Sequence, residues 1–159
     1  MGRVLIMIEK FIEWATNAGW NIEMADEAVA IPEQVASRYK NIPEDWLNFI
    51  QDFNFISNGT EDIWFLTCYD YLDTCHDFEE ISLEAAKGDE SWTEEIKSFW
   101  DNTMPIVMSV GGDYHYFGIN LETGKVVEGW EPEFEDPTEV ADSFNTFIEK
   151  IMSGDIFLV

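Results

Sequence analysis

Residues 105–154 restrict the possible folds of this chain more than any other segment. Residues 105–110 are an apolar run of strand length. Residues 114–121 and 125–130 alternate around Glu122-Thr123-Gly124, which predicts a hairpin whose glycine is the left-handed residue of a three-residue loop. The segment holds no nucleophile–base pair, no metal-ligand spacing and no phosphate loop. We therefore expect function to lie on the protein surface and not in a catalytic motif.

The same segment is predicted to end in an amphipathic helix. Asp136-Pro137-Thr138-Glu139 has the pattern of a capped helix start, with proline in the first turn. It predicts a helix over 137–153 that Gly154 ends. The apolar positions that would form its buried stripe are Val140, Phe144, Phe147, Ile148 and Ile151.

The rest of the chain predicts further helices around a buried strand. Apolar residues at helical spacing predict an N-terminal amphipathic helix over 3–18, which Gly19 ends. The continuous apolar run at 63–69 is typical of a strand inside a sheet. We expect 20–32 to be a loop or an irregular edge segment, and the apolar tail 156–159 to dock on the core or to add an edge strand. The remaining helices are predicted over 33–39, over 44–53, over 79–87, and from a capping box at Ser91-Trp92-Thr93-Glu94 to about Trp100.

The composition indicates one globular, very acidic domain spanning 1–159. The chain has 33 Asp and Glu against 8 Lys and Arg, a formal net charge of −25, yet 46% of it is hydrophobic. Such a field repels nucleic acid and anionic membranes and attracts cationic partners. Solubility alone is the other explanation of the charge. We expect neither a nucleic acid nor a membrane as partner.

Two cysteines and the absence of a signal peptide or apolar span in the sequence predict a cytoplasmic protein. The spacing of Cys68, Cys75 and His76 does not match a zinc site, and these residues lack a third partner for thiol catalysis. Gly111-Gly112-Asp113 lacks the following Lys of a phosphate loop, so a turn is the better interpretation. We expect no catalytic residue, no metal and no cofactor.

The strongest candidate for a binding site is an acidic loop that follows an aromatic residue. Between Val126 and Glu149 there are eight acidic residues and no Lys or Arg. An aromatic side chain at the base of an anionic loop suits a hot spot for a cationic partner. A packed Trp under a solvated loop is the alternative, and the acidic segment 79–95 is a second possible surface. The candidate partner-binding residues are Glu128, Trp130, Glu131, Glu133, Glu135 and Asp136.

Three segments in a fixed order resemble the SUKH superfamily, which groups fungal cell-wall-synthesis regulators with bacterial toxin-immunity proteins. The first is the helix start Ile42-Pro43-Glu44-Asp45-Trp46-Leu47. The second runs from Pro105 through Gly111-Gly112-Asp113 to Phe117-Gly118-Ile119-Asn120-Leu121-Glu122-Thr123-Gly124-Lys125-Val126. The third is Val140-Ala141-Asp142-Ser143-Phe144-Asn145-Thr146-Phe147-Ile148.

This resemblance implies an α+β fold with a curved, mainly antiparallel central sheet and helices packed around it, including amphipathic helices at both ends of the chain. For bacterial members it also implies an immunity protein, an antitoxin that binds and neutralises a toxin, commonly a nuclease or deaminase. The net charge of −25 favours a basic nuclease or deaminase toxin as the partner. The family brings no catalytic residues. Two alternatives stay open, namely a regulatory or scaffolding domain that binds a host protein, and a hydrolase that uses clustered carboxylates.

Overall fold

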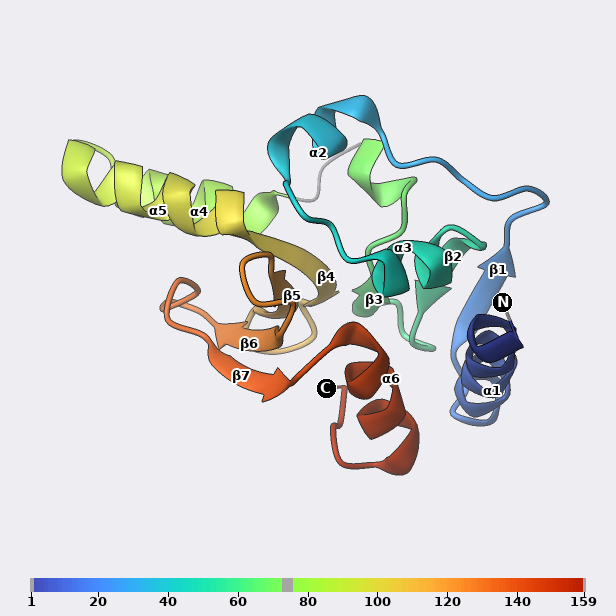
Figure 1. The fold of residues 1–159 in the computed structure, drawn as a ribbon. Coiled ribbons are helices and arrows are strands. Elements are labelled where there is room, and N and C mark those ends of the chain that lie inside the picture. The colour runs from blue at the N-terminus through green and yellow to red at the C-terminus, as the bar shows by residue number, and fades with distance from the viewer. Residues whose placement is uncertain (1, 73–75, 159) are drawn as a thin grey trace.

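The computed structural model describes residues 2–72 and 76–158, which form an α+β fold (Figure 1). Cys75 and Val159 lie outside the described residues. The helices in this part of the chain are α1 (Gly2–Asn17), α2 (Glu33–Arg38), α3 (Glu44–Ile50), the 3-10 helix η1 (Asp70–Leu72), α4 (Asp77–Ala85), α5 (Glu90–Asn102) and α6 (Phe144–Ser153). The strands are β1 (Asn21–Met24), β2 (Phe53–Ser57), β3 (Ile63–Phe65), β4 (Thr103–Ser109), β5 (His115–Asn120), β6 (Val126–Trp130) and β7 (Thr138–Ala141).

The seven strands form one open antiparallel sheet in the order β1-β2-β3-β4-β5-β6-β7. Each strand therefore pairs with its neighbours along the chain. Every residue of β4 is buried, as expected for a central strand covered on both faces. These findings confirm the predicted fold class, with amphipathic helices at both ends. Among the described residues, no helix has the length and apolar character needed to cross a bilayer.

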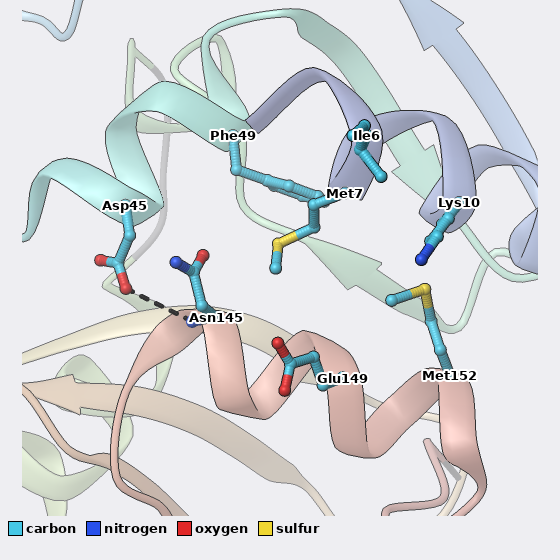
Figure 2. Close-up of a pocket in the computed structure, with 8 residues that line it drawn as sticks. All are labelled: Ile6, Met7, Lys10, Asp45, Phe49, Asn145, Glu149 and Met152. Carbon is cyan, nitrogen blue, oxygen red and sulfur yellow. Dashed lines mark hydrogen bonds between the residues drawn. The ribbon is translucent and has the colours of Figure 1, made fainter. Parts of the chain in front are cut away.

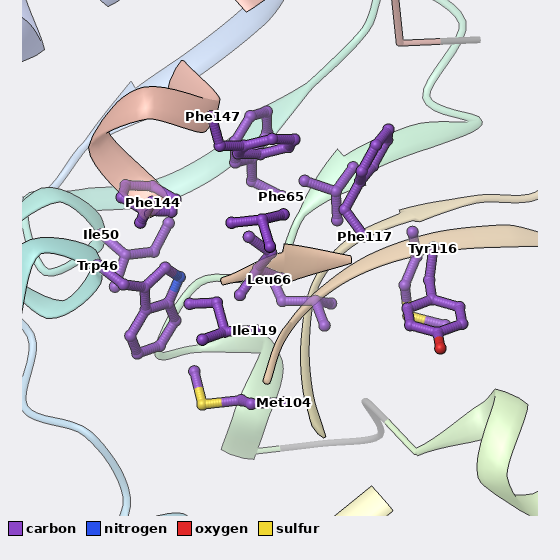
Figure 3. Packing of buried hydrophobic residues seen from close by; sticks show 14 of the residues in the cluster. Trp46, Ile50, Phe65, Leu66, Met104, Tyr116, Phe117, Ile119, Phe144 and Phe147 are labelled. Carbon is purple, nitrogen blue, oxygen red and sulfur yellow. The ribbon is translucent and has the colours of Figure 1, made fainter. Parts of the chain in front are cut away.

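The first face of the sheet packs against α1, α3 and α6. Strand register places Phe65 opposite Val107 and Val107 opposite Phe117, so these side chains share this face. Phe11 of α1 meets Phe65 with ring centroids 5.5 Å apart, and Phe147 of α6 meets Phe117 at 5.0 Å. Figure 3 shows Phe65, Phe117 and Phe147 among the side chains of the hydrophobic core.

The second face of the sheet lies against α4 and α5, which run side by side in Figure 1. Trp64 pairs with Met108 and Met108 with Tyr116, so their side chains share this face. Phe78 of α4 and Trp100 of α5 contact the ring of Tyr116, with centroids 6.3 and 4.9 Å apart. Helices therefore cover both faces of the sheet, but the helices on the second face cover it less completely.

Local signals predicted several element ends correctly. Gly19 and Gly154 follow α1 and α6 with φ of 82° and 86°, and Gly124 has φ of 78° in the β5–β6 hairpin. Positive φ costs glycine little because it has no Cβ. On α1, Ile8, Phe11 and Ala15 are buried as their spacing indicates.

The predicted helix over 137–153 is wrong in its first third. Residues 138–141 form β7, which pairs with β6, and α6 begins only at Phe144. Ser143 is its N-cap, and the Ser143 hydroxyl accepts a hydrogen bond from the Thr146 N–H at 3.1 Å. The β-branched Thr138 and Val140 suit a strand, and β6 offers them an open edge.

Other predicted bounds also shift. Helix α3 ends at Ile50, and Phe53 is instead a buried residue of β2. Strand β3 stops at Phe65, because the Thr67 N–H donates to the Asp70 carboxylate at 2.8 Å and the chain turns into η1. Helix α5 is capped by Asp89, not Ser91, since the Asp89 side chain accepts from Trp92 N–H.

Segment 20–32 contains the edge strand β1, as an irregular edge segment was expected to. The C-terminal tail docks on the core through Ile156 and Leu158 and adds no strand among the described residues, while Phe157 is 75% exposed.

Candidate protein-binding surface

Trp130, the last residue of β6, is held on the surface by a stacked histidine. It pairs across the strands with His115 of β5. The two rings are stacked, with centroids 3.9 Å apart and planes inclined by 9°. His115 is buried, whereas Trp130 is 43% exposed. One face of the indole is therefore fixed by His115, and much of the rest of its surface is open to a partner.

Glu128 fixes the orientation of His115. Its carboxylate lies 2.9 Å from His115 Nε2, and its side chain is half-buried. Because an ionised carboxylate only accepts hydrogen bonds, Nε2 carries the proton in this contact. Glu128 thus belongs to the support of Trp130, two residues away on the same strand.

The loop after Trp130 is anchored from below by aromatic residues. Phe134 is buried, and its ring stacks on Phe78 of α4 with centroids 4.5 Å apart and planes inclined by 7°. The Tyr116 hydroxyl donates to the Phe134 carbonyl at 2.6 Å. Burial, with a smaller effect of the nearby Glu135 charge, raises the pKa of Tyr116 above its ordinary value. The neutral phenol is therefore the stable form at this anchor.

Glu135 is a second anchor of the loop. Its carboxylate accepts hydrogen bonds from the Ser82 hydroxyl of α4 at 2.7 Å and from Trp100 Nε1 of α5 at 2.8 Å. Both donors would lose their partner if Glu135 were replaced by an apolar residue. Glu135 therefore positions the loop on α4 and α5, in addition to contributing charge.

The six residues predicted from the sequence divide into two groups. Trp130, Glu131, Glu133 and Asp136 are exposed and free to meet another molecule, whereas Glu128 and Glu135 support the segment through internal hydrogen bonds. All six lie on β6 and the β6–β7 connection, near one edge of the sheet. Glu128 and Trp130 project from the first face, because they pair with Phe117 and His115 of β5. Glu135 lies on the second face, where it bonds to α4 and α5.

Phe78 of α4 adjoins this loop but lies outside both segments that were predicted to bind a partner. Phe78 stacks on Tyr114 as well as on Phe134, and the Glu131 N–H donates to the Tyr114 carbonyl at 2.8 Å. Tyr114 is 37% exposed. Tyr114 immediately precedes β5 and packs, like Tyr116, against Phe78, but the helix that covers this face could not be identified from sequence spacing alone.

The second predicted acidic segment, 79–95, is only partly available for binding. Glu79 is buried and receives two hydrogen bonds from the Arg38 guanidinium, at 2.9 and 2.8 Å. This ion pair links α2 to α4 and lies beside His76. Burial, together with the charge of Arg38, holds the pKa of His76 below its ordinary value of 6.5. Glu80 and Glu84, by contrast, are exposed on α4.

A groove between α1, α3 and α6, with a volume of about 550 Å³, contains two of the carboxylates that a hydrolase could use (Figure 2). Asp45 accepts hydrogen bonds from the backbone N–H groups of Trp46 and Asn145, at 2.9 and 3.3 Å, so it stabilises the starts of α3 and α6. Glu149 and Lys10 point into the space between α1 and α6. The apolar part of the lining consists of Ile6, Met7, Phe49 and Met152.

Within residues 2–72 and 76–158, no three His, Cys, Asp or Glu side chains are grouped as metal ligands would be. Cys68 is buried, and burial raises the pKa of its thiol to about 11. A thiol with such a pKa is almost entirely protonated at neutral pH and is a poor nucleophile.

Comparison of the chain with protein-family models, with curated proteins and with solved structures finds no match.

Proposed function

We propose that this protein is a non-catalytic binding module, an immunity protein that neutralises a basic protein toxin by direct contact. The observation that carries the proposal is the position of Trp130. Its ring is stacked on a buried histidine, is 43% exposed, and is followed at once by the exposed Glu131 and Glu133. Interfaces are commonly anchored by a Trp that is already held in its bound orientation.

The charge of the chain favours a cationic partner. A net charge of −25 attracts basic surfaces over long distances and disfavours complexes with other acidic macromolecules. Toxins that act on nucleic acid, such as nucleases and deaminases, have basic surfaces because their substrate is anionic. Such a toxin is the partner that this acidic surface complements best, and covering its substrate-binding face would inhibit it.

The first experiment asks whether a toxin is present beside the gene. The toxin-like domain of a neighbouring gene is expressed alone and together with this protein, and cell growth is followed. Rescue of growth by the wild-type protein supports the proposal. Lack of rescue, together with no complex in titration calorimetry, would contradict it. Complex formation with a non-toxic host protein would instead favour the scaffolding alternative.

The second experiment locates the contact. Glu131→Lys with Glu133→Lys should slow association about 10-fold at low salt, since electrostatic steering acts on the encounter rate. Glu9→Lys with Glu13→Lys on α1 changes the net charge equally at the opposite edge of the sheet and is the matched control. Trp130→Ala should mainly accelerate dissociation. Equal association rates for both charge-reversed variants in stopped-flow mixing would exclude this loop.

A further inference from the structure

The second face of the sheet is not completely covered by α4. The Phe78 side chain closes one part of the space between α4 and the sheet, but Ile81, almost one helical turn later, is 43% exposed. A hollow of about 550 Å³ remains there. Trp64 and Met108 line it from the sheet, and Val110 and Tyr114 line it from the β4–β5 connection.

The lining of this hollow is apolar and partly open to water. Val110 and Tyr114 are 38% and 37% exposed, close to the value for Ile81. Contiguous exposed apolar side chains of this kind mark interaction sites more often than isolated ones do. The volume lies in the range of roughly 300–1,000 Å³ that is typical of ligand-binding clefts. A single large side chain with its neighbouring backbone would fit.

The rim of the hollow selects for positive charge. Asp77, Glu80 and Glu84 of α4 border it, and none of the described residues that line it is basic. A second copy of this chain would bring its own carboxylates to this rim, so self-association is electrostatically disfavoured. A basic segment with one apolar side chain would suit this site, because the apolar side chain can pack on the apolar lining (the floor) and the basic residues can pair with the acidic rim.

The hollow is also continuous with the acidic loop. Tyr114, which lines the hollow, accepts a backbone hydrogen bond from Glu131. Phe78 contacts Tyr114 on one side and Phe134 of the loop on the other. The acidic loop is therefore joined to the lining of the hollow through Tyr114 and Phe78.

We propose that the hollow between α4 and strands β3–β5 is the apolar anchor site for the basic partner. It takes one Phe, Leu or similar side chain, while Lys or Arg residues on either side pair with Asp77, Glu80 and Glu84. This inference rests on the proposed function, because the partner is the same basic protein. It adds a site that is separate from Trp130.

The probe is a short synthetic peptide with Phe flanked on each side by Lys and Arg, together with a charge-matched peptide that has Ser in place of Phe. Binding is followed by NMR of the methyl groups of Ile81, Met108 and Val110. The Phe peptide should shift these signals with an affinity about 10-fold higher than that of the Ser peptide. Equal affinities would overturn the proposal. Shifts of these signals with protein concentration alone would indicate a second copy as the occupant and would also overturn it.

Two matched pairs of variants test the floor and the rim separately. Ile81→Ser should weaken binding of the Phe peptide about 10-fold, whereas Ile6→Ser, at an exposed apolar position on α1, should leave its affinity unchanged. Val110→Thr keeps the shape of the side chain and should also weaken binding of the Phe peptide. It tests the same apolar lining if Ile81→Ser does not fold. Glu80→Gln with Glu84→Gln should raise Kd and flatten its salt dependence.

The control for the rim is Glu9→Gln with Glu13→Gln on α1. If Ile81→Ser and Ile6→Ser bind the Phe peptide equally, the hollow is not the anchor site. The proposed function would survive that result if Glu131→Lys with Glu133→Lys still slowed toxin association. Conversely, peptide binding in the hollow without any protection from a toxin would leave this site standing and overturn the proposed function.

Discussion

Gly129 is a position where addition of a single methyl group should have a large structural effect. A Cβ at Gly129 would lie 2.5 Å from Tyr116 Cε1 and 2.9 Å from both Cζ and the hydroxyl oxygen. Tyr116 cannot move aside easily, because its ring is buried against Phe78, Trp100 and Phe134. Gly129→Ala must therefore displace Tyr116 or push β6 away from the second face.

The expected cost has two parts. Overpacking a buried site costs about 1–3 kcal/mol. Displacement of Tyr116 also breaks its 2.6 Å hydrogen bond to the Phe134 carbonyl, which contributes about 0.5–1.5 kcal/mol. We expect Gly129→Ala to lower the free energy of unfolding by about 1.5–4.5 kcal/mol. Because that hydrogen bond anchors the acidic loop, toxin binding should weaken as well.

Equilibrium urea denaturation followed by circular dichroism measures this cost, provided the m value is unchanged. Gly112→Ala is the matched control, since a Cβ there meets no atom within 4 Å. Tyr116→Phe removes only the hydroxyl and reports the hydrogen-bond part. Its effect should be less than additive with Gly129→Ala. A midpoint for Gly129→Ala equal to that of Gly112→Ala would refute the reasoning, since Tyr116 would then not be fixed.

Three further predictions concern the core and two titratable groups. Phe144 is 1% exposed, so Phe144→Ala should lower the free energy of unfolding, measured by urea denaturation, by about 3–5 kcal/mol. Phe157 is 75% exposed, so Phe157→Ala should lower it by under about 0.5 kcal/mol. Similar losses for the two variants would contradict the burial of Phe144. In a Cys75→Ser variant, Cys68 is the only cysteine, and iodoacetamide should alkylate it slowly in the folded protein and rapidly in urea. Mass spectrometry measures both rates. Rapid alkylation of the folded protein would contradict a thiol pKa of about 11 for Cys68. The pKa of His76 in the folded protein lies below its ordinary value of 6.5. As the pH falls below 6.5, the unfolded chain therefore binds a proton at His76 before the folded protein does. The stability that the neutral His76 contributes is present above pH 6.5 and is lost as the pH falls toward the pKa of the folded state. His76→Gln should remove this part of the acid sensitivity, and identical pH profiles of unfolding for both proteins would show that His76 does not cause it.

Local chemistry accounts for the elements that the sequence predicted well. The apolar spacing of α1 and the glycine of the β5–β6 hairpin depend on residues within a few positions of one another, so they could be identified without a structure. That residues 138–141 form a strand and not a helix could not be identified in this way. Whether Thr138 and Val140 join a strand depends on the open edge of β6, which exists only after the sheet has formed.

The candidate site was predicted in part for the same reason. The charge of the 128–136 segment and its Trp are visible in the sequence. The role of Glu135 is not, because its donors Ser82 and Trp100 lie 53 and 35 residues away. The hollow was missed because its lining comes from β3, β4, α4 and the β4–β5 connection, which only the folded sheet brings together.

The sequential order of the strands has a consequence for the speed and order of folding. Strands β4 to β7 follow one another through short connections, so each new pairing closes only a small loop. The β3–β4 pairing must close the long segment 66–102, which contains α4 and α5. We expect the β4–β7 half, with α6 on its first face, to form in the folding transition state, and β1–β3 to join later. The second face of β4 and β5 would then be complete before α4 arrives to cover it.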